Sequence, residues 1–114
     1  MSTMQIQHLK AFHVVARELS FTRAAVHLHC AQSTVTAQIQ QLERTLGAQL
    51  FHRRGRSRIE LTEAGALLES RAAAILLALE AAQQEIGRLQ QGARAARVSA
   101  GRPLRAPVAA VRGL

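Results

Sequence analysis

A group of polar side chains lies on one face of a predicted helix in the first half of the chain. At about 100° per residue, the face is centred on Ser33, Ala37, Gln40 and Arg44, with Thr36 and Gln41 beside it. The one acid of this helix, Glu43, projects to the side, so the face carries no charge that would repel phosphate. Amides read adenine edges, hydroxyl groups contact base edges or phosphates, and the helix N-terminus near Gln32 favours an anion. Taken alone, such a face is more typical of a solvated surface than of a DNA contact, and the neighbouring segments decide between the two.

A basic stretch follows this helix. Residues 52–58 read H-R-R-G-R-S-R and hold four arginines, namely Arg53, Arg54, Arg56 and Arg58. Leu50 and Phe51 precede the stretch, and Ile59 and Leu61 alternate about Glu60 after it, which predicts a two-stranded hairpin with a basic tip. In a DNA-binding protein this hairpin is a wing that follows the backbone and reaches into the minor groove. A solvated loop is the alternative, and a helix-turn-helix directly before the hairpin favours the wing.

Three short helices are predicted to position the polar face. The apolar residues of the first recur at steps of three and four, which predicts an inward face of Ile6, Leu9, Phe12, Ala16 and Leu19. Ser20 is expected to cap a second helix that holds Ala24, Ala25 and Leu28.

A tight connection then leads into the third helix, which carries the polar face. The connection consists of His29, Cys30 and Ala31. The apolar positions of the third helix are Val35, Ile39, Leu42 and Leu46, and Gly47 is expected at its C-terminal cap. Three short helices, the last two closely joined, form a helix-turn-helix pattern.

A long helix is predicted after the hairpin. Thr62 can serve as its N-cap, and Glu63 stands in the first turn, where a carboxylate suits the helix dipole. Its apolar positions form a heptad seam of Leu68, Ala72, Ile75, Leu79, Ala82, Ile86 and Leu89. A helix from Glu63 to Gln91 would be roughly 43 Å long, more than the three-helix unit can cover. We therefore expect the seam to pair two copies in a homodimer; a stripe that only faces the chain's own core is the alternative.

Length and composition limit the class of protein. The chain has 114 residues, 15 Lys and Arg against seven acids that are all Glu, and a net charge of +8, which points toward a polyanionic partner. With 48% hydrophobic residues, we expect one small folded domain. The single cysteine, Cys30, cannot form an intrachain disulfide. Because neither a signal peptide nor a membrane span is apparent in the sequence, we expect a cytoplasmic protein without a membrane contact.

The last segment, residues 92–114, differs in composition from the rest. It holds five arginines, no acid, both prolines and three of the seven glycines, and it has neither a helical nor an alternating pattern. We therefore expect a disordered Arg-rich tail there. The expected domains before it are a winged helix-turn-helix over residues 4–62 and a linker helix over residues 63–91.

The side chains that could form a metal or catalytic site are few. His27, His29 and Cys30 are of ligand type, but residues two apart on a helix face different ways. A chain without Asp cannot form a Ser-His-Asp triad, its Glu residues are scattered singly, and it has no glycine-rich phosphate loop. We expect neither an enzyme nor a cofactor or metal site.

Six ordered motifs span most of the chain. They are L-K-A-F from Leu9, S-F-T-R-A-A from Ser20, A-Q-S-T-V-T-A-Q-I from Ala31, L-E-R-T-L-G from Leu42, L-F-H-R from Leu50 and L-T-E-A-G from Leu61. With these motifs, residues 4–91 resemble the N-terminal winged helix-turn-helix and linker helix of LysR-type transcriptional regulators. The resemblance implies a mainly α-helical winged helix-turn-helix fold, sequence-specific binding of double-stranded DNA, and regulation of transcription.

The resemblance also implies roles for individual residues. It implies a phosphate contact for Thr22, matches Gln32, Ser33 and Thr36 to the start of the recognition helix, and matches Arg53 to the wing arginine. The sequence departs from the family at four positions: the family often has Ser at Ala31, Pro at Ser33, Ser at Thr36 and Arg at Ala37. The candidate DNA-binding residues are Thr22, Gln32, Ser33, Thr34, Thr36, Gln38, Gln40, Arg53, Arg54, Arg56 and Arg58.

Members of that family continue into an effector-binding domain, whose opening pattern is not found after Gly92. We therefore expect a short regulator that binds DNA without response to a small-molecule effector and that can form mixed dimers with full-length relatives. The alternative from another class is a basic interaction protein whose Arg-rich tail binds RNA or acidic surfaces. Salt-dependent binding without preference among duplexes would favour that alternative.

Overall fold

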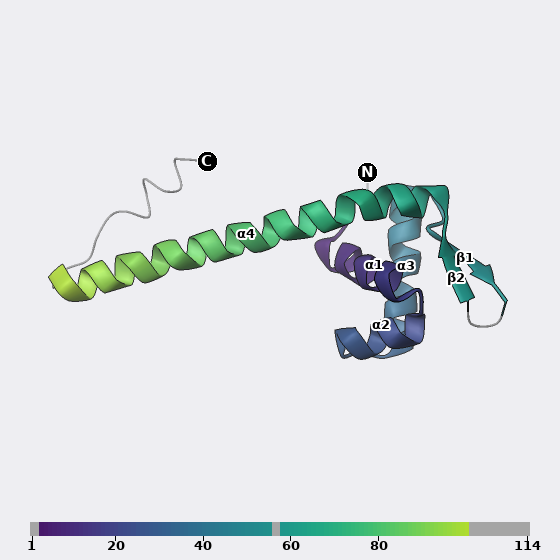
Figure 1. Cartoon of the computed structure of the whole chain (residues 1–114), viewed down its shortest axis with the longest axis horizontal. Helices are drawn as coiled ribbons and strands as arrows, with labels where there is room; N and C mark the ends of the chain where they lie inside the picture. The colour runs from purple at the N-terminus through teal and green to yellow at the C-terminus, as the bar shows by residue number, and fades with distance from the viewer. Residues whose placement is uncertain (1–2, 56–57, 101–114) are drawn as a thin grey trace. The chain divides into compact units, whose positions relative to one another are not determined.

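The computed structural model describes residues 3–55 and 58–100, and for residues 96–100 it describes the backbone alone. Figure 1 shows the order of the elements, which are α1 (Ile6–Glu18), α2 (Phe21–Leu28), α3 (Gln32–Leu46), β1 (Phe51–Arg54), β2 (Arg58–Leu61) and α4 (Glu63–Ala100). The predicted mainly helical class with a two-stranded wing is confirmed. Among the described helices, none is long and apolar enough to cross a membrane.

The chain divides into two compact units, of which the first ends at Leu76 and the second begins at Leu77. The first unit holds α1, α2, α3, the β1–β2 ribbon and the first turns of α4. The inner faces of these elements pack together into one apolar core, in which Phe12, Leu42 and Leu50 are almost completely buried. Burial of apolar area is the main favourable contribution to the stability of such a unit.

The start of α2 and the end of α3 follow the sequence signals. The Oγ atom of Ser20 accepts a hydrogen bond from the Arg23 N–H at 3.1 Å, which confirms the predicted cap of α2. Gly47 ends α3 with a φ of 66°, in the left-handed conformation that glycine adopts without a steric penalty.

The predicted inward face of α1 is wrong at its two ends. Ile6 and Leu19 are 45% and 43% exposed, because they stand at the first residue and at the left-handed C-cap of the helix.

The ribbon is an antiparallel pair whose register is Phe51↔Leu61, His52↔Glu60, Arg53↔Ile59 and Arg54↔Arg58. Residues opposite each other share a face, and successive residues alternate between faces. Phe51 and Ile59 are buried, so one face of the ribbon packs on the core. The predicted hairpin is confirmed.

The first turn of α4 packs closely against the segment that leads into β1. Thr62 caps the helix, since its Oγ atom accepts from the Gly65 N–H at 2.9 Å and donates to the Gln49 carbonyl at 2.6 Å. A Cβ atom at Gly65 would overlap the carbonyl oxygen of Leu50 and lie 2.9 Å from a methyl group of Leu61. Glycine is therefore needed at this position for the helix to pack against the ribbon.

The far end of α4 differs from the prediction. The helix continues to Ala100 instead of ending at Gln91, so a disordered tail that begins at Gly92 is wrong for residues 92–100. The reason is that one glycine costs a helix only about 1 kcal/mol, and the residues that follow it are mostly Ala and Arg, which favour helix. The remainder of the predicted tail, residues 101–114, lies outside the described residues.

Candidate nucleic-acid interface

The exposed face of α3 is polar and carries no carboxylate. Val35, Ile39 and Leu42 point into the core, which turns the other side of the helix outward. The exposed residues on that side are Gln32, Ser33, Thr34, Ala37, Gln40, Gln41 and Arg44, with Thr36 half-buried beside them. The Glu43 carboxylate is half-buried at the edge of this face, where it accepts the Leu50 N–H at 2.8 Å.

Gln38, one of the predicted contact residues of α3, is half-buried and lies about 140° around the helix axis from Ser33 but only about 40° from the exposed Thr34. It therefore stands at the edge of the exposed face, and its contact with DNA stays a prediction.

The start of α3 is joined to the start of α2. The Thr22 hydroxyl donates a hydrogen bond to Oε1 of Gln32 at 3.0 Å, and both side chains are exposed. Ala31, the N-cap residue of α3, has no side-chain hydrogen bond to the helix. The first N–H groups of α3 therefore lack a side-chain acceptor, and they lie beside the two residues that the sequence singled out here.

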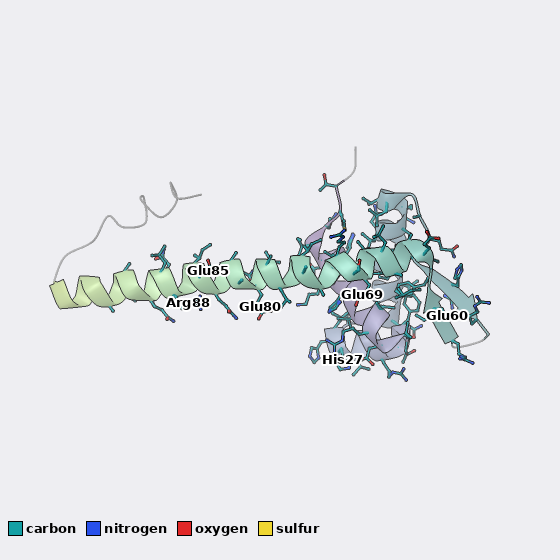
Figure 2. All side chains as sticks on the ribbon, turned by 45° about the horizontal axis from the view of Figure 1, so that its top comes forward. His27, Glu60, Glu69, Glu80, Glu85 and Arg88 are labelled. Atoms are coloured by element: carbon teal, nitrogen blue, oxygen red, sulfur yellow. The ribbon has the colours of Figure 1, made fainter. Side chains whose placement is uncertain are left out.

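The described arginines of the wing are in different environments. The Arg54 Nε atom lies 3.0 Å from a carboxylate oxygen of Glu60, which Figure 2 labels on the ribbon. The Arg53 guanidinium instead lies over the ring of Phe21, 5.9 Å from its centroid. Arg58 is exposed and stands opposite Arg54 in the register. The predicted contact residue Arg56 lies outside the described residues.

A hollow of about 310 Å³ lies between α3 and the ribbon. Its lining brings together three candidate residues, namely Thr36 and Gln40 from α3 and Arg53 from the ribbon. The other lining residues are Phe21, Ile39, Glu43, Gln49, Phe51 and Ile59. α3 and one wing arginine thus present polar groups to the same space.

The predicted dimerisation seam on α4 divides into two parts. Ala72 is fully buried in the core of its own chain, so the prediction of an intermolecular seam is wrong at this position. The reason is that the first turns of α4 close the core of the first unit. Leu68 is half-buried and packs in part against the same core, and its place in the seam stays a prediction. The remaining positions, Ile75, Leu79, Ala82, Ile86 and Leu89, are exposed. Charged residues between them are visible along α4 in Figure 2, which labels Glu80, Glu85 and Arg88.

Three residues with a role in this geometry were not among the predicted site residues. Glu43 ties α3 to the start of the ribbon, Phe21 lies beneath Arg53, and Gly65 admits the carbonyl of Leu50. Phe21 and Gly65 stand in the motifs S-F-T-R-A-A and L-T-E-A-G, and Glu43 is the single acid of α3. These are the signals in the sequence that mark them.

Of the residues named as possible metal ligands, His27 contacts a carboxylate of its own chain. The His27 Nε2 atom lies 3.1 Å from Glu18, which also contacts Arg23 at 3.4 Å. In the described ranges, no group of three or more His, Cys, Asp or Glu side chains could hold a metal ion.

The chain is similar to curated regulators from several bacteria. It is 45% identical over 84 residues to the HTH-type transcriptional regulator GltR of Bacillus subtilis, and 43% identical over 89 residues to a probable nitrogen assimilation transcriptional activator of Synechocystis. These alignments cover 74% and 78% of this chain. The chain spans 28% of the length of each of the two relatives.

Solved structures show the same fold. The DNA-binding domain of BenM, in a crystal structure of its complex with catB site 1 DNA, matches with a TM-score of 0.72 and 34% identity. That match covers 76% of this chain and 97% of the BenM chain. DarR of Vibrio fischeri, in complex with DNA, matches with a TM-score of 0.73 and 31% identity, over 79% of this chain and 30% of DarR.

The family model of the bacterial regulatory helix-turn-helix proteins of the lysR family matches residues 6–66, which extend from the first residue of α1 into α4. This range contains α2, the exposed face of α3 and the wing. It is more than half of the chain. This protein belongs to the lysR family of bacterial regulatory helix-turn-helix proteins.

Proposed function

We propose that this chain binds double-stranded DNA in a sequence-specific manner and regulates transcription. The observation that carries the proposal is the exposed, carboxylate-free face of α3, which shares a hollow with the wing residue Arg53. Amide and hydroxyl groups on a helix of this kind can reach base edges in the major groove. Both solved relatives described above are complexes with DNA, which supports the same class of partner for this chain.

The contact that we propose for each residue, with a base edge or with a phosphate, follows from the chemistry of its side chain. Gln32, Ser33 and Gln40 act on base edges, because amides and hydroxyls offer both donors and acceptors. Thr22 and Arg53 contact phosphates that border the groove, where hydroxyl and guanidinium donors fix the orientation of the protein. Regulation then requires no chemical step, so we propose a DNA-binding regulator and not an enzyme, acting in the bacterial cytoplasm where its DNA partner lies.

We further propose that the chain acts as a homodimer through α4. The described part of the seam that is not used by the core consists of Ile75, Leu79, Ala82, Ile86 and Leu89. Spacings of three and four residues are typical of helices that pair by knobs-into-holes packing. A twofold dimer would offer two recognition helices to two half-sites, which favours a palindromic operator.

The test of the proposed function is a selection followed by a competition. The purified full chain selects duplexes from a random pool, and the enriched duplex then competes with a scrambled duplex at fixed salt. We expect a preference of roughly a thousandfold or more for the enriched duplex. Equal affinity for the two duplexes, together with steep salt dependence, would support a basic protein without sequence preference and contradict the proposal.

A further inference from the structure

Arg53 differs from its neighbour Arg54 in the face of the ribbon that it occupies. Arg53 stands opposite Ile59 in the register and shares its face with Phe51, and both of these partners are buried. Arg54 stands on the other face, with Glu60. Arg53 is therefore directed toward α3, although its own side chain is exposed.

The ring beneath Arg53 packs against Phe51, which in turn packs against Phe12. The Phe21 and Phe51 rings lie edge to face with centroids 5.9 Å apart, and the Phe51 and Phe12 rings are 5.4 Å apart. Phe12 is completely buried, whereas Phe21 is half-buried. A row of rings thus leads from the core to the surface, and the Arg53 guanidinium lies over its outermost member.

The type of contact decides what Arg53 can still bind. A cation over an aromatic face is held without a hydrogen-bond acceptor, so this contact leaves the guanidinium N–H groups available to another partner. The Arg54 guanidinium, in contrast, directs its Nε atom to the Glu60 carboxylate. The one carboxylate that lines the hollow with Arg53 belongs to Glu43, and it accepts the Leu50 N–H.

From these observations we infer that Phe21 is a positioning residue for Arg53. Its ring holds the guanidinium on the α3 side of the wing, so that the free N–H groups contact a phosphate on the border of the groove that α3 enters. This inference rests on the proposed DNA-binding function and deepens it. It assigns different roles to two adjacent arginines: Arg53 is preorganised for phosphate, and Arg54 is an ion-paired residue of the wing.

The inference is tested by a double-mutant cycle on the full chain, with the enriched duplex as the probe. Phe21→Leu removes the ring and keeps an apolar side chain, and Phe21→Tyr keeps the ring. We expect Phe21→Leu to weaken binding about two- to fivefold, which corresponds to an exposed cation–π contact, and Phe21→Tyr to bind like the parent chain. The slope of log affinity against log salt should be unchanged in both variants, because the charge of Arg53 remains.

Arg53→Gln should lower the salt slope by about one, and adding Phe21→Leu to it should cause no further loss of affinity. In the matched cycle with Arg54→Gln, the loss caused by Phe21→Leu should persist in full. A purely structural role of Phe21 predicts equal losses in all three backgrounds, and this result would overturn the inference.

A second measurement needs no DNA and is independent of the proposed function. In the proton NMR spectrum of the free chain, the Arg53 side-chain protons should be shifted upfield by the Phe21 ring, and the shift should disappear in Phe21→Leu and remain in Phe21→Tyr. Unshifted Arg53 protons in the parent chain would overturn the inference even if the chain prefers the enriched duplex. A shifted Arg53 in a chain that prefers no duplex would contradict the proposed function and leave the contact itself established.

Discussion

The Nδ1 atom of His13 on α1 lies 3.0 Å from each of the two carboxylate oxygens of Glu69 on α4. The two residues are 56 positions apart, and their side chains are only 22% and 24% exposed. The contact thus joins α1, at the start of the first unit in the sequence, to α4, at its end, beside the apolar core. The contact secures the first turns of α4, the same turns that bury Ala72.

His13→Ala should lower the free energy of unfolding by about 0.5–1.5 kcal/mol, because it removes a partly buried hydrogen bond and leaves Glu69 without its partner. Urea unfolding followed by circular dichroism measures this change. His27→Ala is the matched control. It removes an exposed pair with Glu18, so its effect should be smaller. Equal effects of the two substitutions would contradict a structural role for the His13–Glu69 contact.

Gln32→Ala should weaken binding to the enriched duplex by roughly 1–3 kcal/mol and change binding to random DNA little, because a base contact carries sequence preference. A competition assay with both duplexes measures the difference. Gln7→Ala is the matched control, since this exposed amide lies on α1 and is not among the candidate DNA-binding residues. Equal losses on both duplexes after Gln32→Ala would show that Gln32 does not read bases.

Glu60→Gln should tighten binding to DNA and steepen its salt dependence by up to about one unit of slope. The substitution removes the carboxylate that pairs with Arg54, so the guanidinium becomes available to phosphate. Titrations at several salt concentrations provide the slope. An unchanged slope would mean that Arg54 does not approach the DNA in the complex.

Leu79→Arg should convert the proposed dimer into a monomer that binds half-sites weakly, because an unpaired charge would enter an apolar interface. Leu77→Arg is the matched control. Leu77 is also exposed and on α4, but it lies about 160° around the helix from Leu79 and outside the predicted seam. Sedimentation equilibrium distinguishes the two species. A dimeric mass for Leu79→Arg would show that the interface lies elsewhere.

Gly65→Ala should destabilise the first unit by about 1–3 kcal/mol, since the added methyl group overlaps the Leu50 carbonyl. Gly87→Ala provides the contrast, because a Cβ atom at Gly87 meets nothing within 4 Å. It should increase the helical signal in circular dichroism, as alanine favours a helix by about 1 kcal/mol over glycine. A thermal unfolding midpoint for Gly65→Ala equal to that of the parent chain would contradict the proposed close contact.

Local features of the fold could be predicted from the sequence because they depend on residues close together in the chain. The periodicity identified Leu9, Phe12, Val35 and Ile39 as core residues, and all four are buried. Ser20, Gly47 and Thr62 marked helix ends through their side-chain or backbone preferences. These signals require no knowledge of how the elements pack.

Tertiary features were beyond the same reasoning. The heptad pattern includes both Ala72 and Leu79, yet only Ala72 is buried in the core. The packing of α4 against the other helices decides which of its apolar residues are buried, and the pattern does not contain this information. Arg53 and Arg54 are adjacent and identical in type, and their different roles arise from the register of the ribbon and from Phe21 and Glu60. The sequence patterns therefore located the candidate interface but could not rank its residues.

The double use of α4 has a thermodynamic consequence. The same helix closes the core of its own chain through Ala72 and leaves Leu79, Ile86 and Leu89 exposed. If two chains associate along this helix, mass action links association to folding, because only the folded helix binds its partner. The thermal midpoint of the DNA-binding unit should then rise with protein concentration, and in Leu79→Arg it should become independent of concentration. The cellular abundance of the protein would thereby set how much of it is folded as well as how much is dimeric.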